Sequence, residues 1–180
     1  MSITRSRGGY TLVELIVAMG LFALVMLLAS GAYIMMIGAN RQAQAISTGI
    51  DSLSFALESM ARSIRTGTAY DCNSASGGST NSCTGGAPLF SFTDQSGNTI
   101  AYELKGASIQ RSTDGGQWVP LTDPSVKISS LMFYVYDTDP AGYKQPRVTI
   151  VVSGSISSGS GGKTDSFTVE TGATMRSVNI

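Results

Sequence analysis

The chain has 180 residues, twelve basic and twelve acidic side chains, and no histidine, so its formal net charge at pH 7 is zero. A balanced charge gives no general attraction to nucleic acid, and the lack of histidine removes the commonest general base and the commonest metal ligand. The length suits one folded domain plus a separate segment, and the 21 glycines are typical of a turn-rich β domain.

A long uncharged run dominates the first quarter of the chain. No residue from Leu15 to Asn40 carries a charge, and the run consists mainly of Leu, Ile, Val, Ala, Met and Phe. About 20 apolar residues in a helix suffice to cross a bilayer, so the run predicts a membrane-spanning helix. Arg5 and Arg7 precede it and favour a cytoplasmic N-terminus, while Arg41 on the far side weakens this asymmetry without reversing it.

An ordinary secretory signal is the alternative interpretation of this N-terminus. Such a signal has an apolar region of about 7–15 residues and then a small-residue cleavage site, and Ala29-Ser30-Gly31 could supply that site. The apolar run is too long for this interpretation, which also leaves the residues just before the run unexplained.

Those residues are Gly9-Tyr10-Thr11-Leu12-Val13-Glu14, and they resemble the leader junction of type IV prepilins and pseudopilins. In that family a peptidase cuts after the glycine, here Gly9, and the new N-terminal residue, here Tyr10, is N-methylated. The fifth mature residue is a glutamate, which is Glu14 when counted from Tyr10. The resemblance implies a structural, non-enzymatic filament subunit.

Glu14 has two interpretations. It can be an interfacial carboxylate that reaches water, because a charge inside a membrane span is costly. It can instead pair with the α-amino group that cleavage creates at Tyr10. That partner is either its own amine or, as the family implies, the amine of a neighbouring subunit, which would set the axial register of a filament. The sequence supplies both charges and does not choose between the partners.

Residues 11 to about 66 are predicted to form one helix of about 80 Å. In its second half, apolar residues recur every three or four positions, which indicates one buried stripe; they are Ile46, Ile50, Leu53, Leu57, Met60 and Ile64. Gly67 is a candidate C-terminal cap. The expected organisation is a leader at 1–9, a transmembrane or filament-core helix at 10–40, an amphipathic helix at 41–66 and an extracytoplasmic β domain at 67–180.

Cys72 and Cys83 lie in a stretch, residues 71–88, that is rich in Ser, Gly, Asn and Thr. An even cysteine pair beyond a membrane span predicts a disulfide in an oxidising compartment, and the stretch is predicted to be a surface loop tied at its ends. Two free thiols are the alternative. A metal site is disfavoured, because two cysteines without histidine supply too few ligands.

After Pro88 the pattern becomes typical of short strands joined by tight turns. Gln95–Asn98 and Thr113–Gly116 predict two hairpins, and Ser153–Lys163, rich in Gly and Ser, predicts a mobile loop. The predicted strands cover residues 89–93, 99–104, 107–112, 117–121, 131–137, 147–152 and 167–171. The expected fold is therefore α+β and pilin-like, with a long N-terminal helix packed on a C-terminal antiparallel β-sheet.

A second, wider resemblance is to J-type or W-type minor subunits of the same family. It is carried by Val17–Leu24, Ile100–Leu104, Ile109–Arg111, Pro120-Leu121, Phe167–Glu170 and Arg176. This resemblance implies a minor subunit of a type IV pilus or type II secretion-like filament that primes assembly or lies at the tip.

The two resemblances together imply the partners and the location. The implied partners are prepilin peptidase, other pilin or pseudopilin subunits, an inner-membrane assembly platform and, before assembly, membrane lipid. The implied location is the cytoplasmic membrane with the C-terminal domain outside, and then a filament at the cell surface or in the periplasm.

The sequence offers no catalytic constellation. No serine has a histidine base, and no glycine run has the Lys-Ser/Thr of a phosphate loop. Asp137-Thr138-Asp139 supplies too few oxygens for calcium and is better interpreted as a solvated turn. We therefore expect no catalytic residues, no metal and no cofactor. The rival functions are a membrane-tethered extracellular binding module that does not polymerise and a tethered hydrolase.

Overall fold

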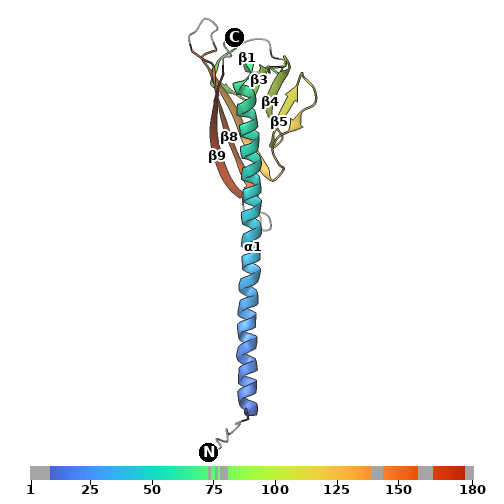
Figure 1. The fold of residues 1–180 in the computed structure, drawn as a ribbon, viewed down its shortest axis with the longest axis vertical. Helices are drawn as coiled ribbons and strands as arrows, with labels where there is room; N and C mark the ends of the chain where they lie inside the picture. The colour runs from blue at the N-terminus through green and yellow to red at the C-terminus, as the bar shows by residue number, and fades with distance from the viewer. Residues whose placement is uncertain are drawn as a thin grey trace, which may run out of the picture. The chain divides into compact units, whose positions relative to one another are not determined.

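The structure, a computed structural model, describes residues 9–72, 74, 75, 77, 81–138, 144–157 and 164–176. The chain divides into two compact units, Met1–Arg41 and Gln42–Ile180. A single helix, α1 (Leu12–Arg65), begins in the first unit and ends in the second (Figure 1). The predicted long N-terminal helix is thus confirmed to within one residue at each end.

The second unit contains two antiparallel sheets in its described part, rather than the one that the sequence predicts. One sheet has the order β1-β3-β4-β5-β6 and the other the order β2-β7-β8-β9. The strands are β1 (Thr68–Cys72), β2 (Cys83–Ala87), β3 (Leu89–Thr93), β4 (Thr99–Lys105), β5 (Ser108–Thr113), β6 (Val119–Pro120), β7 (Val126–Tyr136), β8 (Arg147–Ser157) and β9 (Thr164–Thr174). The α+β class is confirmed.

Both predicted hairpins are present. Strands β3 and β4 pair around Gly97, which has a φ of 87°, and β5 pairs with the short β6 after Asp114 and Gly115, whose φ angles are 51° and 68°. Asp94 Oδ1 accepts hydrogen bonds from the backbone N–H groups of Ser96 and Asn98, both at 2.8 Å. The hydrogen bond from the Asn98 backbone is the main cause that lowers the pKa of Asp94.

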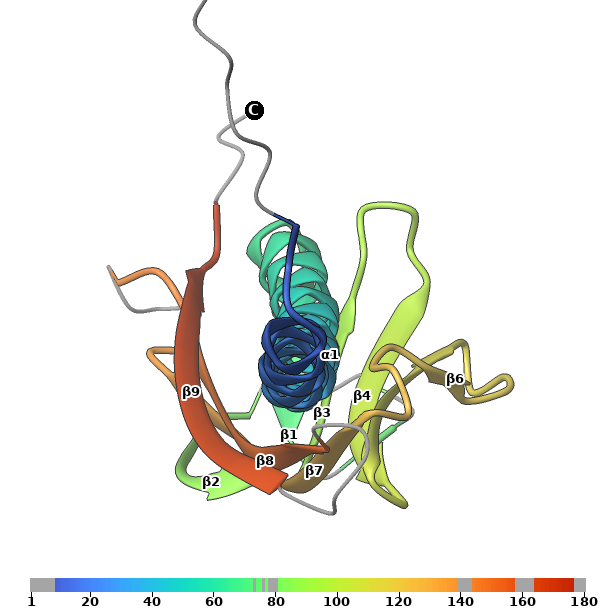
Figure 2. The ribbon, with the colours of Figure 1, turned by 90° about the horizontal axis from the view of Figure 1, so that it is seen from below.

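The helix part of the second unit lies between the two sheets, with β8 and β9 on one side and β3 and β4 on the other (Figure 2). Its buried residues are Gly49, Leu53, Ala56, Leu57, Met60 and Ile64. The predicted stripe is therefore correct from Leu53 to Ile64.

Ile50 is an error in that prediction, because half of its side chain is exposed. The buried face of the helix passes through Gly49 instead, where an added Cβ would lie 2.9 Å from Ile156 Cγ2 on β8. Each helical residue turns the chain by about 100°, so Ile50 points about 100° away from Gly49 and lies at the margin of the buried face.

Aromatic side chains join the two sheets in the core. The ring centroids of Phe90 on β3 and Phe133 on β7 are 5.2 Å apart, and Tyr70 and Phe92 pack around Phe90. Both Phe90 and Phe133 are fully buried. Burying one such side chain contributes about 1.5–3 kcal/mol, so this cluster holds the sheets together.

The C-terminal end of α1 is closed by three donors. The Gly67 N–H and the Tyr70 hydroxyl both donate to the Ile64 carbonyl oxygen, at 3.0 and 2.6 Å, and the Arg176 N–H donates to the Arg65 carbonyl oxygen at 2.8 Å. Gly67 therefore helps to end the helix, as predicted, but without the left-handed conformation of a typical glycine cap. It must be glycine because an added Cβ would overlap the Phe92 ring.

The surface loop predicted at 71–88 is wrong at both ends. Cys72 ends β1 and Cys83 begins β2, and a disulfide joins them with Cα atoms 6.2 Å apart. Since β1 and β2 belong to different sheets, the bond links the two sheets. Residues 73, 76 and 78–80 of the predicted loop lie outside the described part.

The loop predicted at 153–163 is also wrong in part. Residues 153–157 continue β8, paired with both β7 and β9. Val152, Gly154 and Ile156 point inward and are buried, and an added Cβ at Gly154 would lie 2.5 Å from the Lys127 carbonyl oxygen. Glycine here permits close packing between strands, and it is not a sign of mobility. Residues 158–163 lie outside the described part.

Removing the disulfide tests its structural role. Replacing both Cys72 and Cys83 with serine should lower the free energy of unfolding by about 2–3 kcal/mol, because the unfolded chain regains loop entropy. Denaturant unfolding of the variant and the parent measures the loss. Peptide mapping without reductant should recover the two cysteine peptides linked, and free alkylatable thiols in protein from its native envelope would contradict the bond.

Tyr70 makes stability depend on alkaline pH. Burial raises the pKa of Tyr70 above its ordinary value, whereas an unfolded tyrosine ionises near pH 10. The contribution of Tyr70 is therefore complete below about pH 10 and is lost as the pH rises above that value. Replacing Tyr70 with Phe should cost about 1 kcal/mol at neutral pH through the lost hydrogen bond to Ile64, and should make the alkaline fall shallower.

Unfolding free energies measured from about pH 7 to 11 check this prediction. Tyr33→Phe is the control, because Tyr33 is 65% exposed and lies outside the second unit. An alkaline slope in the Tyr70 variant equal to that of the parent would contradict the assignment.

Candidate functional site

The N-terminal segment that carries the leader junction begins with two residues ahead of the helix. Gly9 and Tyr10 are not helical and are exposed, Tyr10 to 85%. Among the described residues, no atom outside the chain neighbours of Gly9 lies within 4 Å of the position that a Cβ would take there. The bond between these residues is thus open to an enzyme in the isolated chain.

Thr11 caps the helix. Its hydroxyl oxygen accepts a hydrogen bond from the Glu14 N–H at 3.3 Å, and its carbonyl oxygen accepts one from the Leu15 N–H at 3.2 Å. A threonine followed three positions later by glutamate is the sequence pattern of a capping box. The residues of the leader junction therefore also fix where α1 begins.

Glu14 lies in the first turn of α1 and is exposed. A carboxylate in this turn is favoured by the positive end of the helix dipole. In the part of the chain that the structure describes, Glu14 has no ion-pair partner. The structure thus leaves the carboxylate available to a group outside the chain, with large apolar side chains at Leu12, Val13 and Leu15 beside it.

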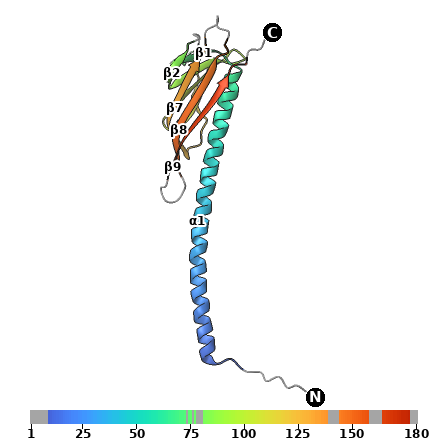
Figure 3. The same ribbon diagram turned by 90° about the vertical axis from the view of Figure 1, so that its left-hand side faces the viewer.

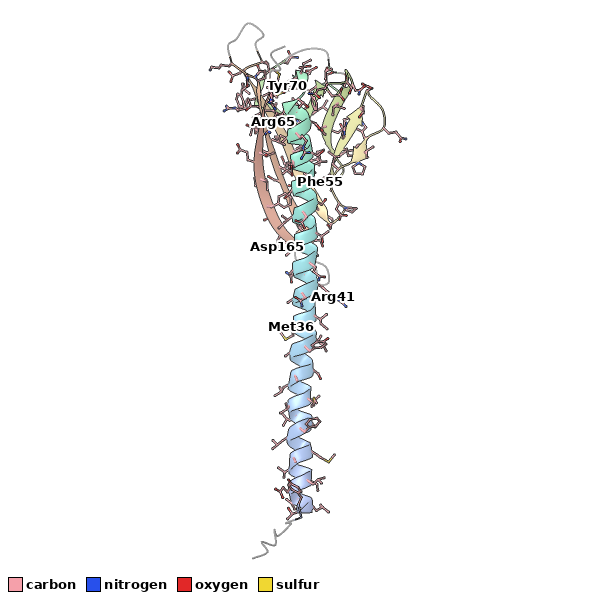
Figure 4. All side chains as sticks on the ribbon, in the orientation of Figure 1. Met36, Arg41, Phe55, Arg65, Tyr70 and Asp165 are labelled. Carbon is pink, nitrogen blue, oxygen red and sulfur yellow. A yellow bond between two sulfur atoms is a disulfide. The ribbon has the colours of Figure 1, made fainter. Side chains whose placement is uncertain are left out.

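No described residue covers the apolar part of α1. All residues from 9 to 36 are exposed, and the large apolar side chains from Leu12 to Met36 are exposed to between 50% and 78%. Figure 4 shows these side chains pointing outward around the helix axis, with Met36 labelled. By length and composition the helix can cross a membrane.

The described part of the second unit contains no group of three or more acidic or cysteine side chains that could hold a metal ion. Asp137 pairs with Lys144 at 3.9 Å, and Asp139, the other carboxylate of the calcium candidate, lies outside the described residues. Cys72 and Cys83 are occupied by their disulfide.

The sequence interpretation overlooked one polar surface, on the outward face of β7, β8 and β9. The guanidinium carbon of Arg147 lies 5.4 Å from the centroid of the Tyr136 ring, and Tyr134 stands on the same face of β7. The available signal was the alternation of Met132, Tyr134 and Tyr136 with the buried Leu131, Phe133 and Val135.

Comparison with known proteins gives one match. The family model described as the prokaryotic N-terminal methylation motif matches residues 4–30, which include the leader junction and the first half of the apolar helix. No curated protein and no solved structure matches the chain.

The match covers the segment whose geometry is described above, and it includes the beginning of α1, the helix suited to a membrane. Residues 4–30 and α1 therefore support assignment of this chain to the type IV prepilin and pseudopilin family, as a pilin-type subunit with a single membrane-anchoring helix.

Proposed function

We propose that this chain is a low-copy, minor subunit that primes assembly of a type IV pilus or type II secretion-like filament, or lies at its tip. The observation that carries the filament role is the exposed apolar surface of α1 from Leu12 to Met36, most of which lies within the methylation motif at residues 4–30. Such a surface needs lipid or other apolar helices around it. The minor role is supported by the resemblance of Val17–Leu24 and Ile100–Leu104 to J-type and W-type subunits.

Maturation starts from a precursor in the membrane. The precursor is inserted with Arg5 and Arg7 in the cytoplasm and residues 67–180 outside. Prepilin peptidase cuts after Gly9, and Tyr10 is then N-methylated. Lipid covers residues 10–40 before assembly, and the helices of other subunits, added at an assembly platform, replace it afterwards. Lipid tails and apolar side chains are similar solvents, so this exchange needs little energy.

Glu14 selects the register in which the subunit enters. The cut places a positive amine at Tyr10, close in sequence to the negative carboxylate. In an apolar surrounding, an unpaired charge is expensive. When Glu14 pairs with the amine of a neighbouring subunit, neither charge remains unpaired. The two groups can meet at only one axial displacement of one helix relative to the other, so the pair fixes the register.

The second half of α1 does not supply the apolar contact with other subunits. Leu53, Met60 and Ile64 are already buried against the sheets of the same chain. Their apolar surface is not available to another subunit, so the main apolar contact with the polymer comes from residues 10–40.

Processing is the first prediction of this proposal. N-terminal sequencing and intact mass of the membrane-extracted protein should show a chain that starts at Tyr10 and carries one added methyl group. A start at Met1, or one near Gly31, would instead favour a tethered module that does not polymerise.

The second prediction concerns a variant in which Val replaces Glu14. The variant should insert into the membrane normally, yet enter filaments about tenfold less or worse, since an uncompensated charge in a span costs about 2.5–3.5 kcal/mol. Immunoblots of sheared filaments and of membranes measure the two pools. Glu14→Asp, which keeps the charge, is the matched control. Normal incorporation of the valine variant would rule out the pairing.

The third prediction concerns how abundant the protein is in filaments. Deleting the gene should reduce filament number or secretion, while quantitative mass spectrometry of sheared filaments should place the protein far below the major subunit. If the protein is the dominant component along the shaft, the minor role fails and the pilin-type assignment survives.

A further inference from the structure

The outward face of β7, β8 and β9 carries a hollow of about 480 Å³ that has no part in the role proposed above. Its lining residues are Tyr134, Tyr136, Arg147, Thr149, Val151 and Glu170. They occupy neighbouring positions in the sheet, with Tyr136 opposite Arg147, Tyr134 opposite Thr149, and Val151 opposite Glu170. Figure 3 shows the three strands side by side. The hollow is therefore built on regular, paired strands.

The aromatic rings in the hollow are held in place. Arg147 lies over the Tyr136 ring, with 5.4 Å between the guanidinium carbon and the ring centroid. Tyr134 lies against Gly86 of β2, where an added Cβ would come within 2.8 Å of Tyr134 Cε1 and where φ is +84°. Only glycine suits position 86, and because it has no side chain, the backbone of β2 can lie against the Tyr134 ring.

The polar side chains of the hollow can still form hydrogen bonds or ion pairs with a ligand. Within the described residues, neither Arg147 nor Glu170 takes part in an ion pair, and the hydroxyl groups of Tyr134 and Tyr136 have no protein hydrogen-bond partner. Glu170 is opposite Val151, four residues along β8 from Arg147, so the Cα atoms of Arg147 and Glu170 are about 14 Å apart, from the rise along a strand and the spacing between neighbouring strands. The hollow thus offers a donor at one end, an acceptor at the other and aromatic surface beside the donor.

We propose that this hollow binds an extended, neutral oligosaccharide. A sugar ring has apolar C–H faces that lie against aromatic rings, and hydroxyl groups that both donate and accept hydrogen bonds. The Arg147 guanidinium donates to such hydroxyls, the Glu170 carboxylate accepts from them, and the tyrosine and threonine hydroxyls do either. The separation of Arg147 and Glu170 along the strands favours a chain of linked rings over one sugar.

Other ligand classes fit less well. A nucleic acid needs several cations along its phosphates, and this hollow has one cation and one anion. An apolar small molecule needs a mainly apolar lining. A peptide that adds to a sheet needs a free strand edge. Of these three strands only β9 is an edge strand, and five of the six lining residues lie on β7 and β8, which are paired on both edges.

The test uses the full-length processed protein in fluorescent lipid nanodiscs, because detergents with sugar headgroups would compete. The nanodiscs are applied to an array of neutral and anionic oligosaccharides of increasing length, with empty nanodiscs as the blank. The strongest neutral ligand is then titrated calorimetrically against the parent and the variants Tyr134→Ala, Arg147→Ala and Glu170→Gln. The matched controls are Lys105→Ala and Glu103→Gln on β4 of the other sheet.

We expect retention of neutral oligosaccharides that strengthens with chain length, a Kd about tenfold higher or more in the Tyr134 and Arg147 variants, and control values within about twofold of the parent. Tyr136→Phe removes only a hydroxyl and serves where a larger change unfolds the domain. The proposal is overturned if no neutral oligosaccharide exceeds the blank, if only anionic ones bind, or if the variants bind as the parent does. Protection of Tyr134 and Tyr136 from nitration in assembled filaments would show that a subunit covers the face, and would overturn it too.

Discussion

Apolar helix surface has to be covered, and α1 meets this requirement in two ways along its length. From Leu12 to Met36 the large apolar side chains are exposed and no described residue covers them, whereas Leu53, Met60 and Ile64 are buried against two sheets. The first surface can exchange lipid for neighbouring helices at little cost, since both are apolar. The second cannot leave its sheets without losing about 1.5–3 kcal/mol for each large side chain. The anchor can therefore change its surroundings while the domain stays folded.

The same division makes the end of α1 an important junction. The last carbonyl groups of a helix lack partners within it, and here Tyr70 from β1 and Arg176 after β9 donate to two of them. Tyr70 belongs to the first sheet, and Arg176 follows the last strand of the second. The disulfide from Cys72 to Cys83 joins the sheets again close to Tyr70 in sequence. The hydrogen bonds at the C-terminal end of α1 thus hold the first and the last described strands of the domain to the same helix end.

Local patterns predicted most of these elements, and the errors occur where distant residues decide. The spacing of Leu53, Leu57, Met60 and Ile64 identified the buried face, but it did not show that this face continues through Gly49, which approaches β8 closely, and leaves Ile50 at the margin. Residues 153–157 have the composition of a linker, yet pairing on both sides makes them a strand. An even cysteine count predicted the bond between Cys72 and Cys83, whereas its position between two sheets depends on a topology that no local pattern contains. The aromatic face of β7 was overlooked for a related reason, because the alternation that identifies a core says nothing about what the other face does.

That outward face is free to vary because the core does not use it. On β7 and β8 the inward positions, such as Phe133, Val135 and Ile150, are fully buried, so changes at Tyr134 or Arg147 remove no core packing. In a subunit repeated along a shaft, such a face would also have to accept neighbours on every side. A subunit present once, at an end, is released from that constraint, and a polar hollow there costs the assembly nothing. The two proposals are compatible for this reason, and they remain independent: the hollow depends on side chains of β7 to β9, and the filament role on residues 4–40.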